Sequence, residues 1–304
     1  MSASASGTRH PEGLPRRLAE LDRCLVMGVV NVTPDSFSDG GRWLDAEAAV
    51  RHGVRLAAEG ADLVDVGGES TRPGAGRVSV AEELRRVLPV VEGLVDAGVP
   101  VSVDTMRAEV ADAALACGAA VVNDVSGGLA DPAMAELVAD ARVPFVAMHW
   151  RGASDRMEEL AVYGDVVADV RDELARRLDA LVAAGVEAGR VVLDPGFGFA
   201  KRAEHGWALL AHLDVLAALG RPLLVGTSRK RFLAQAVATA DGEPASPPER
   251  DAATAATSAL AAAAGAWAVR VHEVRASADA VRVVAAVDAA RAARSAALTA
   301  ASPA

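Results

Sequence analysis

The run CLVMGVV, residues Cys24 to Val30, is the first of eight short apolar stretches, each rich in valine, along this chain of 304 residues. Stretches between these runs, such as Ala46 to Ala58 and Val166 to Ala184, carry apolar residues every three or four positions, the period of an amphipathic helix. Strands buried on both faces that alternate with helices form a parallel sheet. Eight such units favour closure into an α/β fold, the (β/α)8 barrel of the TIM type. The other seven runs are Asp62 to Val66, Pro100 to Val103, Ala120 to Val122, Val143 to Met148, Arg190 to Leu193, Pro222 to Val225 and Trp267 to Val271.

Polar side chains stand at or just after the ends of these strands. In a barrel of this type the loops that follow the strands hold the catalytic groups, so residues at these positions point to a site. A single Asn or Asp there could instead cap the next helix. Lys and Arg do not cap helix starts, and the set as a whole therefore favours one shared site. Its members are Asn31, Asp65, Asp104, Asn123, His149, Asp194, Lys230, Arg270 and His272.

The length and composition allow one large hydrophobic core with a tail at each end. Hydrophobic residues make up 52% of the chain, and a barrel of this type uses about 250 residues. We expect a flexible N-terminal tail over residues 1–20, a single barrel domain over 21–288 and a flexible, Ala-rich tail over 289–304.

Charge and hydropathy exclude several classes of protein. The formal net charge of −10 argues against nucleic acid as a partner, because binding a phosphate backbone needs a dominant basic surface. No early apolar stretch is long enough for the core of a signal peptide, and none along the chain is long enough for a membrane span. We therefore expect a cytoplasmic protein with no membrane contact. Cys24 and Cys117 match no metal-ligand spacing and are expected to be reduced core residues.

Two cationic clusters late in the chain could hold an anionic ligand. Arg229, Lys230 and Arg231 follow the seventh predicted strand, while Arg270 and His272 belong to the eighth. Closure of the barrel places strand eight beside strand one, and therefore brings Arg270 and His272 next to Asn31. An amide oxygen suits Mg²⁺, which binds phosphates with few protein ligands and several waters. The sequence predicts a diphosphate and Mg²⁺ site at this junction.

Eight motifs, in this order, resemble the dihydropteroate synthases of the pterin-binding enzyme family. The resemblance spans about residues 25–287, and eight motifs in sequence are much more specific than any one of them. The motifs are MGVVNVTPDSFSDGG, DVGGESTRPGA, SVDTMR, NDVSGG, MHWRG, DPGFGFAK, GTSRKRF and RVHEV. The family resemblance implies a transferase of folate biosynthesis that joins a pterin diphosphate to p-aminobenzoate, giving dihydropteroate and diphosphate.

The resemblance also implies roles for individual residues. Asn31 would bind Mg²⁺, and Arg270 and His272 would hold the diphosphate. Asp104 and Lys230, with that cationic pair, would form the catalytic group. The residues expected to bind the pterin diphosphate are Thr71, Asp104, Asn123, Met148, Asp194, Lys230, Arg270, Val271 and His272. The chemistry agrees for Asp194, because the N–H donors on the edge of a pterin need an acceptor such as a carboxylate.

The second substrate, p-aminobenzoate, is expected between two Gly-rich loops. Phe37 and Pro73 would enclose its ring, and Arg72, Ser228 or Arg231 would meet its carboxylate. Sulfonamides should compete at this place. Which of the three groups meets the carboxylate stays open in the sequence, because Arg231 occupies a position where many relatives carry serine.

Two other functions are compatible with part of this pattern. Methyltransferases of the pterin-binding family share the Asp, Asn and Asp of the pocket but pass a methyl group to a corrinoid partner, and they need no diphosphate site. A non-catalytic pterin-binding paralogue is the other alternative. Arg270 and His272, together with the two loops, favour the synthase over the methyltransferase. The intact metal, loop and lysine positions favour it over the paralogue. Family similarity further implies a homodimer formed through the late helices.

Overall fold

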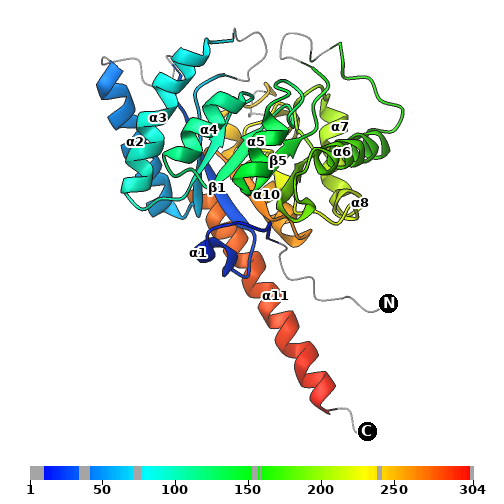
Figure 1. Ribbon diagram of the computed structural model, residues 1–304. Coiled ribbons are helices and arrows are strands. Elements are labelled where there is room, and N and C mark those ends of the chain that lie inside the picture. Colours follow the sequence, from blue (N-terminus) through cyan, green and yellow to red (C-terminus); the bar gives the residue numbers. More distant parts are fainter. Residues whose placement is uncertain are drawn as a thin grey trace.

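The computed structural model describes residues 10–33, 42–70, 77–152, 157, 159–237 and 242–301. Within these residues eight parallel strands form the centre of the molecule, with helices around them (Figure 1). Each strand falls on one of the eight apolar runs, so the predicted fold class is confirmed. The strands are β1 (Leu25–Asn31), β2 (Leu63–Gly67), β3 (Val101–Asp104), β4 (Val121–Asp124), β5 (Phe145–Met148), β6 (Val191–Asp194), β7 (Leu224–Val225) and β8 (Ala268–Val271).

The sheet closes on itself in the predicted way. Neighbouring strands pair in the order β6-β5-β4-β3-β2-β1-β8-β7, so the first strand lies beside the last, with Met27 opposite Arg270. A bridge between Leu193 and Leu223 joins β6 to the start of β7 and completes the ring. Side chains that are far apart in the sequence therefore meet at one end of the barrel.

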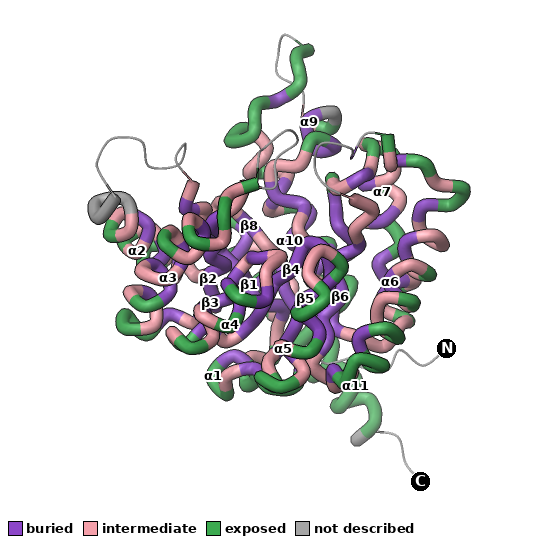
Figure 2. The backbone as a smooth tube through the Cα atoms, turned by 45° about the horizontal axis from the view of Figure 1, so that its top comes forward, coloured by how far each residue is buried: buried purple, intermediate pink, exposed green. Residues whose placement is uncertain are grey.

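Helices follow most of the strands and cover the outside of the barrel (Figures 1 and 2). Two of them begin with a side-chain cap: Ser79 accepts a hydrogen bond from the N–H of Glu82, and Asp165 accepts from Val167 and Ala168. The α-helices are α1 (Arg16–Ala19), α2 (Arg42–Glu59), α3 (Val80–Asp96), α4 (Ala108–Ala116), α5 (Met134–Ala141), α6 (Val166–Ala183), α7 (Ala203–Ala211), α8 (Leu213–Ala217), α9 (Leu233–Ala236), α10 (Asp251–Ala263) and α11 (Arg275–Ala301).

Alternation along the strands divides the core into two clusters. Successive side chains of a strand point to opposite faces, and in β1 Leu25 and Met27 pack inside the barrel while Val26 and Val30 pack in the layer beneath the helices. The same alternation holds in the other strands. It places on the inner face, at the carboxyl ends of the strands, the side chains of Asn31, Asp65, Asp104, Asn123, Met148, Asp194 and Arg270.

The N-terminal segment differs from the expected tail. Residues 10–20 contain α1, and Leu14 and Leu18 are buried in the inner cluster with Leu25. They close the end of the barrel opposite the polar strand ends. Glu12 fixes the segment further, because its N–H donates to the main-chain oxygen of Gly189. The inner cluster would otherwise be open to water at this end.

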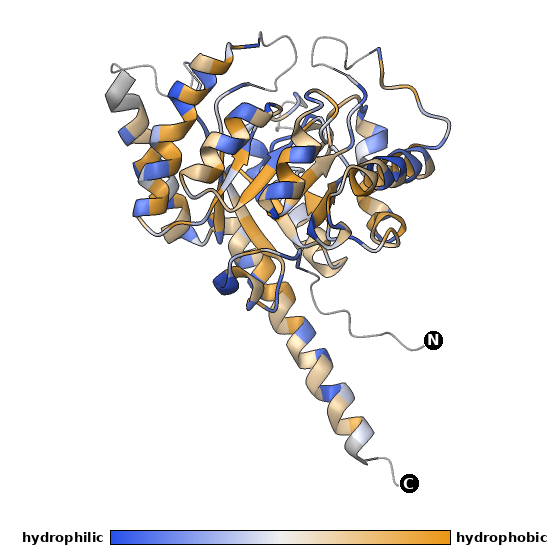
Figure 3. Ribbon diagram, in the orientation of Figure 1, coloured by the Kyte–Doolittle hydropathy of each residue, from blue (hydrophilic) through white to orange (hydrophobic). Residues whose placement is uncertain are grey.

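The C-terminal segment is helical over most of its length. Helix α11 continues to Ala301 and projects away from the barrel (Figure 1). Val281 is buried, but Val283 and Leu298 are both exposed, each at 63%. Figure 3 shows hydrophobic residues in the strands of the barrel and a mixture of hydrophilic and hydrophobic residues along the projecting part of α11. None of the helices within the described residues combines the length and apolar character of a membrane span.

Candidate active site

Arg270 lies at the centre of a charged network inside the carboxyl end of the barrel. From β8 its Nε donates to Asp65 of β2 at 2.6 Å, and its Nη2 donates to Asp104 of β3 at 2.7 Å. Asn123 of β4 donates to the same oxygen of Asp65 at 2.9 Å. Four strands are thus connected by three hydrogen bonds, and two of these bonds are ion pairs.

Burial dominates the electrostatics of this network. Burial raises the pKa of Asp104 to about 7, although the nearby guanidinium of Arg270 opposes the rise. For Arg270 burial alone would lower the pKa, but Asp65 and Asp104 outweigh it and raise the pKa above its ordinary value. Asp65 is fully buried, and its second oxygen has no hydrogen-bond partner among the described residues.

Asp194 and Lys230 form the next part of the site. The Asp194 carboxylate ends β6, and one of its oxygens accepts from the N–H of Gly196 at 2.7 Å. The other oxygen faces Gly226, where a Cβ atom would lie 3.9 Å away, so the missing side chain leaves space in front of it. Lys230 follows β7, with its Nζ 4.2 Å from the centre of the Phe199 ring. Burial raises the pKa of Asp194 and lowers the pKa of Lys230 to about 8.

Ser228 contacts His272 in this structure. Its hydroxyl lies 3.0 Å from Nδ1 of His272 and accepts from the His272 main-chain N–H at 3.1 Å. Ser228 is buried, so this arrangement orients the imidazole that sequence analysis assigned to the diphosphate. The contact of Ser228 with p-aminobenzoate stays a prediction.

The remaining cations of the seventh loop diverge. Arg229 has a left-handed backbone, at φ 59°, and its guanidinium makes two hydrogen bonds to Asp251 of α10. Arg231 is exposed. Lys230 is therefore the member of this cluster that lies beside Phe199 at the barrel end.

Val271, predicted to contact the pterin diphosphate, has its side chain on the outer face of β8. The side chain packs in the outer cluster, beneath the helices. Only the main chain of Val271 can reach a ligand inside the barrel. Met148, in contrast, shares the inner face with Asp194, its neighbour in the pairing of β5 with β6.

The residues present suit Mg²⁺ only together with oxygens from a substrate. No group of three or more His, Cys, Asp or Glu side chains within the described ranges could hold an ion alone. Asn31 is partly exposed on the inner face of β1 and offers one amide oxygen. It lies two residues after Val29, which pairs with Asp65 of β2. Mg²⁺ commonly combines one or two protein ligands with phosphate oxygens and waters, and this donor fits that pattern.

Four of the predicted contacts lie outside the described residues. They are Phe37, Thr71, Arg72 and Pro73, from the two Gly-rich loops. Their assignment to p-aminobenzoate and the pterin stays a prediction.

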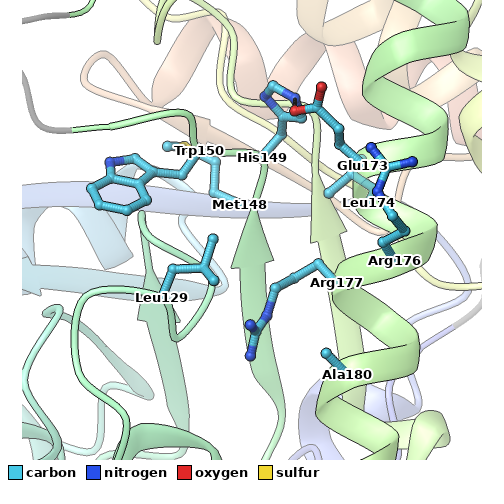
Figure 4. Close-up of a pocket in the computed structure, with 9 residues that line it drawn as sticks. All are labelled: Leu129, Met148, His149, Trp150, Glu173, Leu174, Arg176, Arg177 and Ala180. Atoms are coloured by element: carbon cyan, nitrogen blue, oxygen red, sulfur yellow. Dashed lines mark hydrogen bonds and ion pairs between the residues drawn. The ribbon is translucent and has the colours of Figure 1, made fainter.

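Sequence analysis assigned no role to three residues that contact this site. Asp65 was recognised only as a polar strand end, yet it binds both Arg270 and Asn123. Phe199 and Lys201 belong to the motif DPGFGFAK, and that motif was the available signal for them. A cavity of about 290 Å³ also lies near this region, between the end of β5 and α6 (Figure 4).

Comparison with known proteins agrees with this geometry. Residues 27–272 match the family described as "Pterin binding enzyme". The dihydropteroate synthase of Mycobacterium leprae is 59% identical over 258 residues, which cover 84% of this chain and 91% of that protein. A structure of Xanthomonas albilineans dihydropteroate synthase with 4-aminobenzoic acid is 50% identical, with a TM-score of 0.81, and covers 88% of this chain and 94% of that one. A second structure from that organism, in complex with 7,8-dihydropteroate, is 48% identical with a TM-score of 0.78, covering 88% and 95% of the two chains. The chain therefore belongs to the pterin-binding enzyme family and, within it, to the dihydropteroate synthases.

Proposed function

We propose that this chain condenses 6-hydroxymethyl-7,8-dihydropterin diphosphate with p-aminobenzoate to give 7,8-dihydropteroate and diphosphate. One observation carries the proposal. Hydrogen-bonding side chains from six strands and the loop after β7 gather at one end of the barrel, in a chain 59% identical to a named dihydropteroate synthase. The gathered groups include acceptors for the N–H donors of a pterin and cations that can contact a diphosphate.

The pterin would lie between Asp194 and the pair of Asp104 and Asn123. The free oxygen of Asp194 accepts the N–H donors of the pterin edge, and Asp104 and Asn123 bind the other polar atoms. A buried site of this kind rejects ligands that lack those groups, because its own polar atoms would then be left without partners. Met148 supplies an apolar wall for the ring, and Lys230 and Thr71 complete the contacts.

Arg270 and His272 would bind the diphosphate. Two donor atoms of Arg270 are used by the carboxylates, and its third nitrogen keeps its N–H donors for a phosphate oxygen. Ser228 holds the His272 ring in place for the same ligand. The main chain of Val271 lies between these two residues.

In the reaction, the amine nitrogen of p-aminobenzoate bonds to the methylene carbon of the pterin. The bond from that carbon to the diphosphate oxygen breaks, and the amine loses a proton. Negative charge grows on the leaving oxygen, so Arg270 and His272 stabilise the transition state more than the ground state. A Mg²⁺ ion held by Asn31 would add positive charge at the same oxygens.

The p-aminobenzoate ring would lie against Phe37 and Pro73, with Arg72 or Arg231 near its carboxylate. Similar structures were solved with 4-aminobenzoic acid, from Xanthomonas albilineans, and with a sulfonamide drug, from Yersinia pestis. Ser228 stays a third candidate for the carboxylate, beside its contact with His272.

An assay of diphosphate release tests the proposal. Release should require the pterin diphosphate, p-aminobenzoate and Mg²⁺ together, and dihydropteroate should form in equal amount. A folded protein that binds the pterin but releases no diphosphate would instead be a binding paralogue. Methyl transfer from a methylated pterin to a corrinoid protein would support the methyltransferase reading.

We also propose that the protein is a homodimer in the cytoplasm. Helices α10 and α11 pack together and expose Leu260 at 58%, Val283 at 63% and Val287 at 44%. A second copy would cover these side chains. Light scattering should give twice the monomer mass, and the double variant Leu260→Asp/Val283→Asp should give the monomer mass. Both cysteines are free, as in proteins of reducing compartments.

A further inference from the structure

A chain of hydrogen bonds runs from the loop after β6 to the outer surface of the barrel. Lys201, at the end of that loop, has its Nζ 2.9 Å from Nδ1 of His149. The other nitrogen of His149 lies 2.9 Å from a carboxylate oxygen of Glu173, on α6. Figure 4 shows the Glu173 carboxylate beside the His149 ring, with both side chains near the outer cavity.

The charges of the partners fix the protonation of His149. A carboxylate can only accept, so the nitrogen facing Glu173 carries the hydrogen. Burial lowers the pKa of His149 to about 4, and the ring is therefore neutral at pH 7. Its Nδ1 then has a lone pair, and this lone pair accepts the hydrogen bond from Lys201.

Lys201 connects this chain to the substrate site. Its Nζ also donates to the main-chain oxygen of Phe199 at 3.1 Å, and the Phe199 ring lies against Lys230. The same Nζ lies 3.4 Å from where a Cβ of Gly196 would be. Gly196 in turn donates its N–H to Asp194. The amino group of Lys201 thus bonds to the loop at Phe199, which contacts Lys230, and lies beside Gly196, which contacts Asp194.

The loop needs such support because its backbone is strained. Ala200 has a φ of 47°, a left-handed value that residues other than glycine rarely adopt. Gly196 and Gly198, with φ of 69° and 75°, make the other left-handed turns of the loop. A second contact helps to hold Ala200, since the hydroxyl of Tyr163 donates to its main-chain oxygen at 3.0 Å. The Tyr163 ring lies 3.8 Å from the guanidinium of Arg151.

The outer end of the chain is also fixed. Arg151 makes two hydrogen bonds to Glu173, and Glu173 therefore holds both Arg151 and His149. These contacts lower the pKa of Glu173 to about 2, the hydrogen bond from His149 being the largest cause. The carboxylate is ionised throughout the physiological range and stays a strong acceptor.

We propose that Lys201, His149 and Glu173 position the loop of residues 195–200 for pterin binding, with Lys201 as the positioning residue and His149 as its acceptor. This inference rests on the proposed pterin site. Loss of Lys201 leaves Asp194 and Lys230 chemically intact but lets the loop that aligns them relax. Removal of residues that orient binding groups in this way weakens ligand binding by about 10- to 100-fold in metal sites, and we expect the same range here.

The test uses variants that remove the hydrogen bond of His149 to Lys201 or its hydrogen bond to Glu173 independently. Lys201→Met removes the donor, and His149→Leu removes the acceptor. His149→Asn keeps an amide oxygen near the position of Nδ1, so it preserves the partner of Lys201 while losing the bond to Glu173. Arg176→Met, an exposed cation one turn further along α6, is the matched control.

Titration calorimetry with the pterin diphosphate measures the affinity of each variant, and we expect the following order. Lys201→Met and His149→Leu should each weaken binding by about 10- to 100-fold, and the double variant should be no weaker than either single one. His149→Asn should lie within about threefold of the wild type, as should Arg176→Met. The KM for p-aminobenzoate should change much less than the pterin affinity in every variant.

Other outcomes overturn the inference. Equal losses for His149→Asn and His149→Leu, or additive effects in the double variant, would show that Lys201 and His149 do not act as one unit. A lower melting temperature with unchanged pterin affinity would assign them to stability alone. If Lys201→Met does not fold, the comparison of the two His149 variants decides. Failure of the wild type to bind the pterin would refute the proposed function instead.

Discussion

Replacing Arg270 by methionine should destabilise the barrel, because it removes the cation between two buried carboxylates. The guanidinium donates to Asp65 at 2.6 Å and to Asp104 at 2.7 Å, and Asp65 is fully buried. Breaking a buried ion pair costs about 3–5 kcal/mol. The Arg270 side chain is 23% exposed, so water reaches part of the site, and we take the lower end of that range, about 3 kcal/mol.

The loss should grow with pH. Arg270 opposes the effect of burial on Asp104, so without it the pKa of Asp104 in the folded state rises further above the unfolded value. A carboxyl group with a raised folded pKa favours the fold when protonated, and this contribution is lost as pH rises from the unfolded pKa through the folded one. In the wild type the pKa of Asp104 is already about 7. The difference in unfolding free energy should therefore be larger at pH 8 than at pH 5.5.

Urea unfolding followed by tryptophan fluorescence measures these differences. Arg282→Met is the matched control, because Arg282 and Asp279 form an exposed pair with 54% and 62% of their side chains accessible. Its loss should be below about 1 kcal/mol. Adding Asp65→Asn to Arg270→Met should restore part of the stability. A loss below about 1 kcal/mol for Arg270→Met at pH 8, with an unchanged denaturant slope, would refute the argument.

Three further predictions concern the ligand site and the barrel floor. Removal of Mg²⁺ by a chelator should weaken binding of the pterin diphosphate, by calorimetry, far more than binding of the pterin alcohol without diphosphate. Affinity for the pterin diphosphate should fall by about tenfold between pH 7 and 9, because Lys230, one of its contacts, loses its charge as pH rises through about 8. Lys230→Met should make this fall smaller. Leu18→Ala should lower the unfolding free energy by about 3 kcal/mol, since Leu18 fills the closed end of the barrel, whereas an alanine at the exposed Val283 should change it little.

The strands were predictable because a barrel strand is buried on both faces and leaves a continuous apolar run. The observed strands begin one or two residues inside most of the predicted runs. At Pro222 the reason is chemical: proline has no N–H, and it contributes only its oxygen, which accepts from Leu193. The N-terminal segment was missed because Leu14 and Leu18 are isolated among polar residues. Their burial exists only once the strands have closed into a barrel with an open end.

The sequence predicted which residues gather at the site, but it did not predict which of them form hydrogen bonds or ion pairs with one another. Strand ends identified Asp104, Asn123 and Arg270, because parallel strands bring their carboxyl ends to one edge. The hydrogen-bond partners depend on the register between neighbouring strands and on the direction in which each side chain points, and the sequence states neither. Ser228 shows the difficulty: it lies 44 positions before His272, and the adjacency of β7 and β8 turns its hydroxyl towards that ring.

The charge balance of the barrel end explains why a metal ion should matter for a diphosphate ligand. Arg270 is already compensated by Asp65 and Asp104, and Lys230 lies near Asp194. These carboxylates match the local cations, so little net positive charge is left for an incoming diphosphate. Protonation of Asp104, whose pKa is about 7, would free part of the charge of Arg270. A divalent ion beside Asn31 would supply more, and it would do so without weakening the carboxylates that bind the pterin. Binding of the diphosphate half should therefore depend on the ion, while binding of the pterin half should depend on Asp194 and Asn123.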